Sequence, residues 1–261
     1  MTRFVDRGVM ISGGATGIGA ATARAFAREG ARVTILDVNT DDGEATADEI
    51  GGCFREVDVT DEAAVGGAVE EAVAAYGRLD VMHANAAVEW TKTIVDTTLE
   101  EWNRIIAVNL TGVYLCCRHA LARMVEQRRG SLLLTASPHG LVTVPDAGAY
   151  AASKGGVLAL NRALALEGAP HNVRSNALLP GAIDTPMLRR EAEMAADPEE
   201  QARRFGRMHP IARLGQAEEV AEAALFLASD SASFITGTAL AVEGGLLAVI
   251  PSGPALSYTE T

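Results

Sequence analysis

The sequence is poor in aromatic residues and in cysteine. Phe, Trp and Tyr make up 5% of its 261 residues, so a core must be built from Ala, Val, Leu and Ile, which suit buried parallel strands covered by helices. The three cysteines, Cys53, Cys116 and Cys117, have no regular spacing and indicate no disulfide framework, so we expect a reducing, cytoplasmic environment. Cys116 and His119 are one helical turn apart, but no second pair of ligands accompanies them, and we predict no metal site.

Positive charge and long apolar runs are also scarce. The 22 Lys and Arg residues face 34 Asp and Glu residues, and the formal net charge of −12 argues against nucleic acid or an anionic membrane as the main partner. The polar start at residues 1–7, with only three apolar residues after Gly8, predicts no signal peptide. No uninterrupted apolar run of about 18 residues occurs, so we expect no membrane span and a small-molecule partner instead.

Short apolar runs alternate along the chain with longer alanine-rich segments of helical period. The runs predict strands at Gly8–Ser12, Arg32–Leu36, Cys53–Val57, Val81–Ala84, Ser131–Ala136, Val173–Leu179 and Ala239–Val242. The segments between them predict helices near residues 18–29, 41–50, 61–76, 99–107, 110–127, 149–168 and 216–228. This alternation indicates an α/β fold with a doubly wound parallel sheet of about seven strands and helices on both faces.

Two segments depart from this alternation. Residues 186–209 are charged and follow a Pro-Gly turn, and an excursion of this length inside a compact domain predicts a substrate lid. Residues 251–261 contain prolines and a glycine near their start and predict an irregular C-terminal arm. We therefore expect a single domain over residues 1–250.

A glycine-rich loop follows the first predicted strand. The run Ser12-Gly13-Gly14-Ala15-Thr16-Gly17-Ile18-Gly19 leads from that strand directly into an alanine-rich helix. Glycines allow a tight turn and a close approach of the backbone to a pyrophosphate, and the helix start offers unpaired N–H groups. Strand, loop and helix together predict a dinucleotide site.

Asp37 refines this prediction. It ends the second predicted strand, 18 residues after Gly19, where a carboxylate accepts hydrogen bonds from the adenosine ribose. The same charge repels the phosphate that distinguishes NADP from NAD, and neither Thr16 nor Val38 supplies a compensating base. NAD is therefore the predicted cofactor.

A tyrosine and a lysine lie one helical turn apart further along the chain. Lys154 follows Tyr150 by four positions, which places both side chains on one face of the predicted helix. A neighbouring ammonium group favours a phenolate, so the pair can supply a proton acceptor. Ser137 follows the fifth predicted strand, and Asn109 lies at the start of a predicted helix.

These motifs together resemble the short-chain dehydrogenase/reductase family, in its subgroup of about 250 residues. The resemblance rests on Ser12-Gly13…Gly17-Ile18-Gly19, Asn85-Ala86, Asn109, Ser137, Tyr150…Lys154, Pro180-Gly181 and the closing runs Phe234-Ile235-Thr236-Gly237 and Val242-Glu243-Gly244-Gly245. It covers essentially the whole chain. It implies a Rossmann-like fold, hydride transfer between NAD(H) and a secondary alcohol or ketone, and a homotetramer.

The resemblance also implies roles for the matching positions. Tyr150 would be the general acid and base, Lys154 would hold the nicotinamide ribose and lower the pKa of Tyr150, Ser137 would bind the substrate oxygen, and Asn109 would order a water. Cofactor contacts are expected from Ser12, Gly13, Thr16, Gly17, Ile18, Gly19, Asp37, Val38, Asp58, Val59, Asn85, Ala86, Ala87, Tyr150, Lys154, Pro180, Gly181, Ile183 and Thr185. Subunits would meet through helices 110–127 and 149–168, with Cys116, Cys117 and Leu158 on the contact faces.

The sequence departs from the family pattern at two places. Ser12 stands where threonine is usual, which keeps a hydroxyl group. The usual Asn-Asn-Ala-Gly run reads Ala84-Asn85-Ala86-Ala87, which removes one polar side chain and adds a methyl group near the nicotinamide. Neither change removes a catalytic group.

The expected substrate pocket is mostly apolar. Its predicted contacts are Ser137, His139, Val144, Tyr150, Trp90 and Met187. The arginines of residues 186–209 alternate with Glu191, Glu193, Glu199 and Glu200, which favours a solvated helical face. Two other functions stay open, an NAD-linked epimerase or dehydratase and a non-catalytic NAD-binding sensor.

Overall fold

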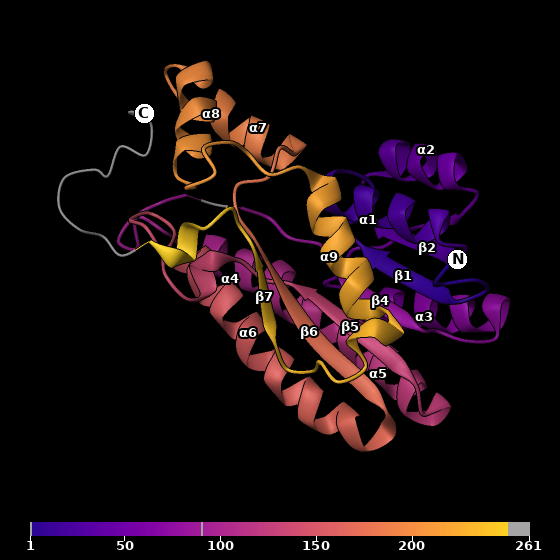
Figure 1. The fold of residues 1–261 in the computed structure, drawn as a ribbon. Coiled ribbons are helices and arrows are strands. Elements are labelled where there is room, and N and C mark those ends of the chain that lie inside the picture. Colours follow the sequence, from indigo (N-terminus) through magenta and orange to yellow (C-terminus); the bar gives the residue numbers. More distant parts are fainter. Residues whose placement is uncertain (1, 90, 250–261) are drawn as a thin grey trace.

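The computed structural model describes residues 2–89 and 91–249 and confirms the predicted α/β architecture (Figure 1). Within these residues seven parallel strands form one sheet in the order β3-β2-β1-β4-β5-β6-β7. The strands are β1 (Gly8–Ser12), β2 (Arg32–Asp37), β3 (Cys53–Glu56), β4 (Val81–Ala84), β5 (Gly130–Thr135), β6 (Val173–Pro180) and β7 (Ala239–Val242). Each end lies within one residue of its predicted position, and the strand order reverses between β1 and β4.

Helices cover both faces of the sheet. On one face α1 (Gly17–Arg28), α2 (Thr40–Ile50) and α9 (Ala217–Ala228) contribute buried side chains to a common core with the strands. On the other face the core is formed with α3 (Glu62–Tyr76), α5 (Val113–Gln127) and α6 (Gly148–Gly168). All five residues of β1 are buried, as expected for a strand enclosed on both sides.

The two helices predicted at 99–107 and 110–127 form one continuous helix. A π-helical turn over Ala107–Gly112 joins α4 (Leu99–Ile106) to α5, so the chain has no break between them. The resulting segment, Leu99–Gln127, is long and apolar enough to span a membrane by length and composition, with a mean hydropathy of 1.4 in its most apolar window. Its buried side chains, such as Ile105, Leu115 and Met124, pack in the core of the domain.

Two short helices form most of the segment predicted as a lid. They are α7 (Pro186–Glu193) and α8 (Pro198–Arg207), and Figure 1 shows them together beyond one end of the sheet. Each begins with a proline after a capping side chain, Thr185 for α7 and Asp197 for α8. The predicted arm at residues 251–261 lies outside the described residues.

The prediction that Cys116, Cys117 and Leu158 lie on contact faces between subunits is wrong. Both cysteines are fully buried and Leu158 is 4% exposed, because all three side chains face the core beneath the sheet. Burial also raises the pKa of the Cys116 and Cys117 thiols above the usual value.

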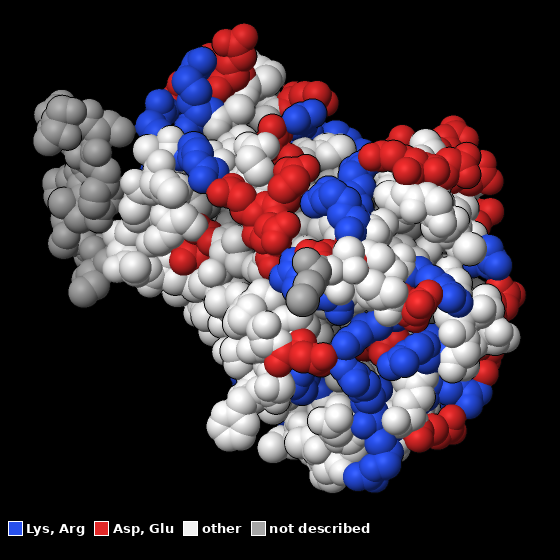
Figure 2. Space-filling model, turned by 45° about the vertical axis from the view of Figure 1, so that its right-hand side comes forward, with Lys and Arg blue, Asp and Glu red and all other residues white. Residues whose placement is uncertain are grey.

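Acidic side chains gather on α2. Its exposed carboxylates are Asp41, Asp42, Glu44, Asp48 and Glu49, and Figure 2 shows a red area at the upper right, the side on which Figure 1 labels α2. Because α2 starts three residues after Asp37, this charge lies beside the carboxyl end of β2.

Candidate active site

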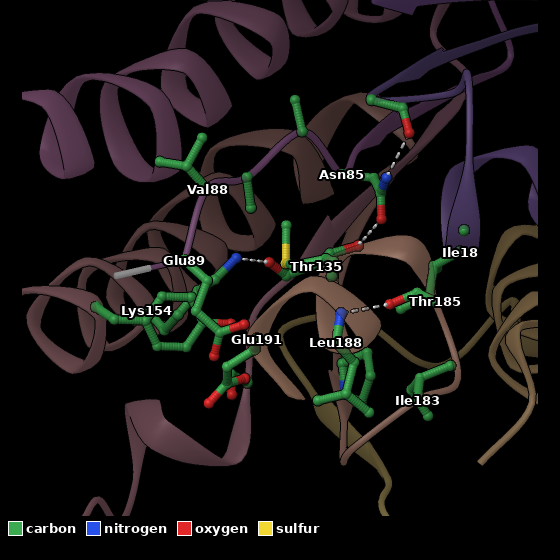
Figure 3. A pocket seen from close by; sticks show the side chains of 18 of the residues that line it. Ile18, Asn85, Val88, Glu89, Thr135, Lys154, Ile183, Thr185, Leu188 and Glu191 are labelled. Atoms are coloured by element: carbon green, nitrogen blue, oxygen red, sulfur yellow. Dashed lines mark hydrogen bonds between the residues drawn. The ribbon is translucent and has the colours of Figure 1, made fainter. Parts of the chain in front are cut away.

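A cavity of about 1260 Å³ opens at the carboxyl ends of the strands. Its walls come from the loops after β1 to β6, from α6, and from α7 and α8 of the segment predicted as a lid (Figure 3). A ligand site at this edge of a parallel sheet, next to the point where the strand order reverses, is the usual arrangement in doubly wound folds. The volume exceeds that of most pockets for single small ligands, so a dinucleotide and a substrate can share it.

The glycine-rich loop passes close to the loop after β4. Gly13 has a φ of +64°, and a Cβ atom there would lie 2.7 Å from the Cα of Ala86. A Cβ atom on Gly19 would lie 1.9 Å from the carbonyl oxygen of Gly13. Both positions therefore require glycine.

The N-terminus of α1 suits an anionic group. Thr16 makes no capping hydrogen bond with its side chain, and the first turn carries no acidic residue. By contrast, α2, α3 and α4 each begin with a side chain that accepts from the backbone. Thr16, Gly17 and Ile18 line the cavity, so their unpaired N–H groups and the helix dipole fit the pyrophosphate of a nicotinamide cofactor.

Asp37 is held in place at the edge of this cavity. Its carboxylate accepts hydrogen bonds from the backbone N–H groups of Ala15 at 3.0 Å and Asn39 at 3.0 Å. The residues that line the cavity next to it are Val38, Asn39 and Asp42, none of which is basic. A carboxylate here fits the two hydroxyls of an unphosphorylated ribose.

Hydrogen bonds connect the glycine-rich loop to the loop after β4. The Ser12 hydroxyl oxygen accepts from the backbone N–H of Asn85 at 3.0 Å and of Ala86 at 3.2 Å. Asn85 donates from its amide to the carbonyl oxygen of Gly13 at 3.0 Å. The Ser12 hydroxyl, which a threonine would also provide, therefore joins the glycine-rich loop to the loop after β4.

The Asn85 amide is fixed from behind by two further polar residues. Thr135 donates to the Asn85 amide oxygen at 3.0 Å and lies 2.8 Å from Nε2 of His83. Because Thr135 donates its hydroxyl proton to Asn85, its oxygen must accept from His83. The proton of the neutral His83 ring therefore lies on Nε2. His83 is fully buried, which lowers its pKa to about 3, so the ring is neutral and structural.

Tyr150 and Lys154 lie on α6 with Lys154 behind the tyrosine ring. The Lys154 ammonium nitrogen is 5.5 Å from the ring centre and donates to the carbonyl oxygen of Thr135 at 2.9 Å. Burial lowers the pKa of Lys154 to about 8, against the opposite effect of the Glu89 charge. A group with this pKa is mostly protonated at neutral pH and can donate to a ribose hydroxyl.

The pKa of Tyr150 differs in direction from the prediction. Burial, with the charges of Glu89 and Glu191, raises it above its usual value, and a hydrogen bond with Ser137 opposes the rise. The predicted lowering by Lys154 is therefore not the net effect. The ring also contacts His139 edge-on, with 5.6 Å between the ring centres.

Asn109 lies behind the cavity wall, in the π-helical turn. Its amide donates to the Val88 carbonyl oxygen at 2.8 Å and accepts from the Val88 N–H at 2.8 Å, so it pairs with the main chain of one residue. It also donates to the Ser153 hydroxyl at 3.3 Å. The Asn109 side chain therefore holds the loop after β4. Its predicted role in ordering a water would need an acceptor or donor of Asn109 that these contacts do not occupy.

Most of the predicted site residues line the one cavity. Those of the predicted cofactor set that do so are Gly13, Thr16, Gly17, Ile18, Asp37, Val38, Asp58, Val59, Asn85, Ala86, Ala87, Tyr150, Lys154, Pro180, Gly181, Ile183 and Thr185. Ser137, His139, Val144 and Met187 line it as well. Among the described residues Ser12, Gly19 and Asn109 are buried behind its surface, and Trp90 lies outside the described residues.

The sequence prediction missed a pair of acidic residues. Glu191 was assigned to a solvated helical face, yet it lines the cavity with Glu89. The remaining glutamates behave as predicted, since Glu199 and Glu200 pair with Arg203 and Glu193 is exposed. Helical spacing could have identified Glu191, because it lies four and three residues after Met187 and Leu188 on the inner face of α7.

A family model described as enoyl-(acyl carrier protein) reductase matches residues 13–247. The chain belongs to the short-chain dehydrogenase/reductase family. This explains why the glycine-rich loop, Ser137, Tyr150 and Lys154 meet at one cavity. The chain is accordingly an oxidoreductase of the alcohol dehydrogenase and ketone reductase type.

Two relatives and one solved structure illustrate the similarity. The chain is 42% identical to an inactive 2-(S)-hydroxypropyl-CoM dehydrogenase of Xanthobacter autotrophicus over 87% of this chain and 100% of the relative. It is 36% identical to a 2,5-dichloro-2,5-cyclohexadiene-1,4-diol dehydrogenase of Sphingobium indicum over 95% and 100%. The crystal structure of levodione reductase is 34% identical, has a TM-score of 0.92 and covers 95% of this chain and 100% of its own.

Replacing Asn109 with alanine is expected to destabilise the fold. Asn109→Ala leaves the N–H and carbonyl groups of Val88 without a partner, so the free energy of unfolding should fall by about 2–4 kcal/mol. Urea denaturation measures this loss. The control is Asn103→Ala on the exposed side of α4, and equal stability of the two variants would show that the Val88 contacts contribute nothing.

Proposed function

We propose that this protein oxidises a secondary alcohol with NAD, using Tyr150 as the general base. The observation that carries the proposal is the position of Tyr150, Ser137 and Lys154 in the cavity that also contains the glycine-rich loop and Asp37. A protein that only binds NAD would have no use for a tyrosine and a serine at the cavity surface. Since one relative is inactive, these side chains, and not family membership alone, support catalysis.

The proposed mechanism assigns one task to each side chain. Ser137 donates to the substrate oxygen and orients the alcohol, and Tyr150 accepts the hydroxyl proton as the C–H bond breaks. A nicotinamide cofactor bound in its oxidised form would supply the hydride acceptor and a positive charge near the phenol, which would favour the phenolate. Lys154 would hold the cofactor ribose from the position fixed by its hydrogen bond to Thr135. Asn109 keeps the loop after β4 against this centre.

NAD is the proposed cofactor because negative charge surrounds the ribose position. Asp37 faces the cavity, and Asp42 lines the same stretch of wall. The acidic surface of α2 adds to this field (Figure 2). A 2′-phosphate carrying about −1.5 to −2 charges would be repelled there.

Removal of the Tyr150 hydroxyl should abolish most of the activity. Tyr150→Phe keeps the ring and its contact with His139 but removes the proton acceptor, so kcat should fall by about 10²–10⁴-fold. Absorbance of NADH measures kcat with cyclohexanol, and NADH fluorescence checks that cofactor binding is kept. Near-normal turnover of this variant would exclude Tyr150 as the base.

Neutralising Asp37 should relax the choice of cofactor. Asp37→Asn keeps the shape of the side chain and removes the charge, so the ratio of kcat/KM for NADP to that for NAD should rise by about tenfold or more. Asp41→Asn, an exposed position on α2, is the matched control. The NAD assignment fails if the wild-type protein uses NADP as well as NAD.

We also infer a cytoplasmic homotetramer. Apolar side chains on the outer faces of α5 and α6 support subunit contacts, since Tyr114 is 44% exposed and Leu166 is 77% exposed. Light scattering should give four times the monomer mass of 27.2 kDa. Tyr114→Lys and Leu166→Lys together should lower that mass, and a wild-type protein that is monomeric at micromolar concentration would refute the inference.

A further inference from the structure

Two glutamates lie together in the cavity, and the mechanism above does not use them. Glu89 comes from the loop after β4, and Glu191 comes from α7 of the lid. Figure 3 shows their carboxyl groups next to each other. Residues from two distant parts of the sequence thus meet on one wall of the cavity.

The pair lies within electrostatic reach of the reaction centre. The charges of Glu89 and Glu191 both raise the pKa of Tyr150, and Glu89 also raises the pKa of Lys154. In turn, burial and the proximity of Glu191 raise the pKa of Glu89 to about 7. The pair therefore takes up a proton more readily than two free glutamates would, and Glu89 is partly protonated near neutral pH.

Within the described part of the chain the two carboxyls hydrogen-bond to each other, and neither pairs with a basic side chain or a backbone N–H group. By contrast, Asp184 just before α7 binds Arg189 at 2.7 Å and Glu200 of α8 binds Arg203 at 3.0 Å. Their mutual hydrogen bond leaves further carboxyl oxygens at the cavity wall, and a ligand in the cavity can supply a donor to these acceptors. The pair is therefore arranged to contact a polar group of the substrate.

We propose that Glu89 and Glu191 determine substrate specificity by accepting a hydrogen bond from a second hydroxyl group of the substrate, whose reacting hydroxyl lies at Tyr150 and Ser137. The inference rests on the alcohol oxidation proposed above and names its substrate class, a diol. A carboxylate on the substrate would meet like charge and would be rejected. A relative that acts on a 1,4-diol shows that this family accommodates a second hydroxyl group.

The test compares diols with the matching simple alcohol. The probes are cyclohexane-1,2-diol, cyclohexane-1,4-diol and cyclohexanol, and the readout is the ratio of kcat/KM for each diol to that for cyclohexanol. In the wild type this ratio should be about tenfold or more for one of the diols, because unpaired acceptors discriminate against the substrate without the hydroxyl. The substrate 4-hydroxycyclohexanecarboxylate should react less well than cyclohexanol.

Methionine variants remove the acceptors with little change in volume. Glu89→Met and Glu191→Met should each bring the diol ratio to about one and improve the relative use of the carboxylate. Removing either charge also changes the pKa of Tyr150, which should affect the diol and cyclohexanol equally. The ratio of their kcat/KM values cancels this effect and is therefore the readout. Glu193→Met, exposed on the same helix, is the matched control and should keep the wild-type ratio.

A diol ratio near one in the wild type, or the same ratio in the wild type and both variants, would overturn the inference while leaving alcohol oxidation intact. A stronger preference for 4-aminocyclohexanol would assign a cationic substrate instead. If no alcohol is oxidised, the proposed function fails separately. Calorimetric titration of the NAD-saturated Tyr150→Phe protein with diol and cyclohexanol, with and without Glu89→Met, then still decides whether the pair binds a second hydroxyl.

Discussion

A chain of hydrogen bonds across the carboxyl ends of β1, β4 and β5 fixes the geometry of the active site. Asn85 joins the Gly13 carbonyl to the Thr135 hydroxyl, and the Thr135 carbonyl accepts from Lys154 on α6. The loop that suits a pyrophosphate and the lysine that would hold the ribose are therefore positioned by the same three side chains. Because His83 is buried and neutral, it supports this network over the whole physiological pH range.

Charged side chains act on two different regions of the cavity. At the edge near α2, the negative charge of Asp37 and of the α2 surface would disfavour a phosphate on the ribose, which supports the proposal of NAD as the cofactor. At the reaction centre, the negative charges of Glu89 and Glu191 oppose ionisation of Tyr150, while Lys154 remains largely protonated. A cation beside Tyr150 would favour ionisation of the phenol and would so make the phenolate, which is the base, more available. The charge distribution thus favours proton transfer in the fully assembled complex over the free protein.

The sequence predicted correctly those features that depend only on residues close together in the chain. Strand ends, the glycine-rich loop and the helical spacing of Tyr150 and Lys154 follow from burial pattern, backbone conformation and periodicity, which are readable from neighbouring residues. The errors concern contacts between distant segments. The helices predicted separately at 99–107 and 110–127 are joined, because a π-helical turn continues the backbone hydrogen bonding between them. No residue in Ala107–Gly112 is a signal for such a turn. Cys116, Cys117 and Leu158 were placed outward because periodicity alone does not say which helix face meets the sheet. Glu191 was read as solvated because its partner, Glu89, lies 102 residues earlier in the sequence.

The contact between Asn109 and Val88 has a consequence for how this site can diversify. Asn109 binds the main chain of Val88 and makes no demand on the side chain that follows at position 89. The peptide that carries residue 89 is anchored to the helix behind the catalytic centre, whatever that residue is. Mutation at 89 can therefore alter the chemistry of the pocket without displacing its frame. The catalytic apparatus and the recognition surface are separable during evolution, which gives one scaffold access to many alcohols.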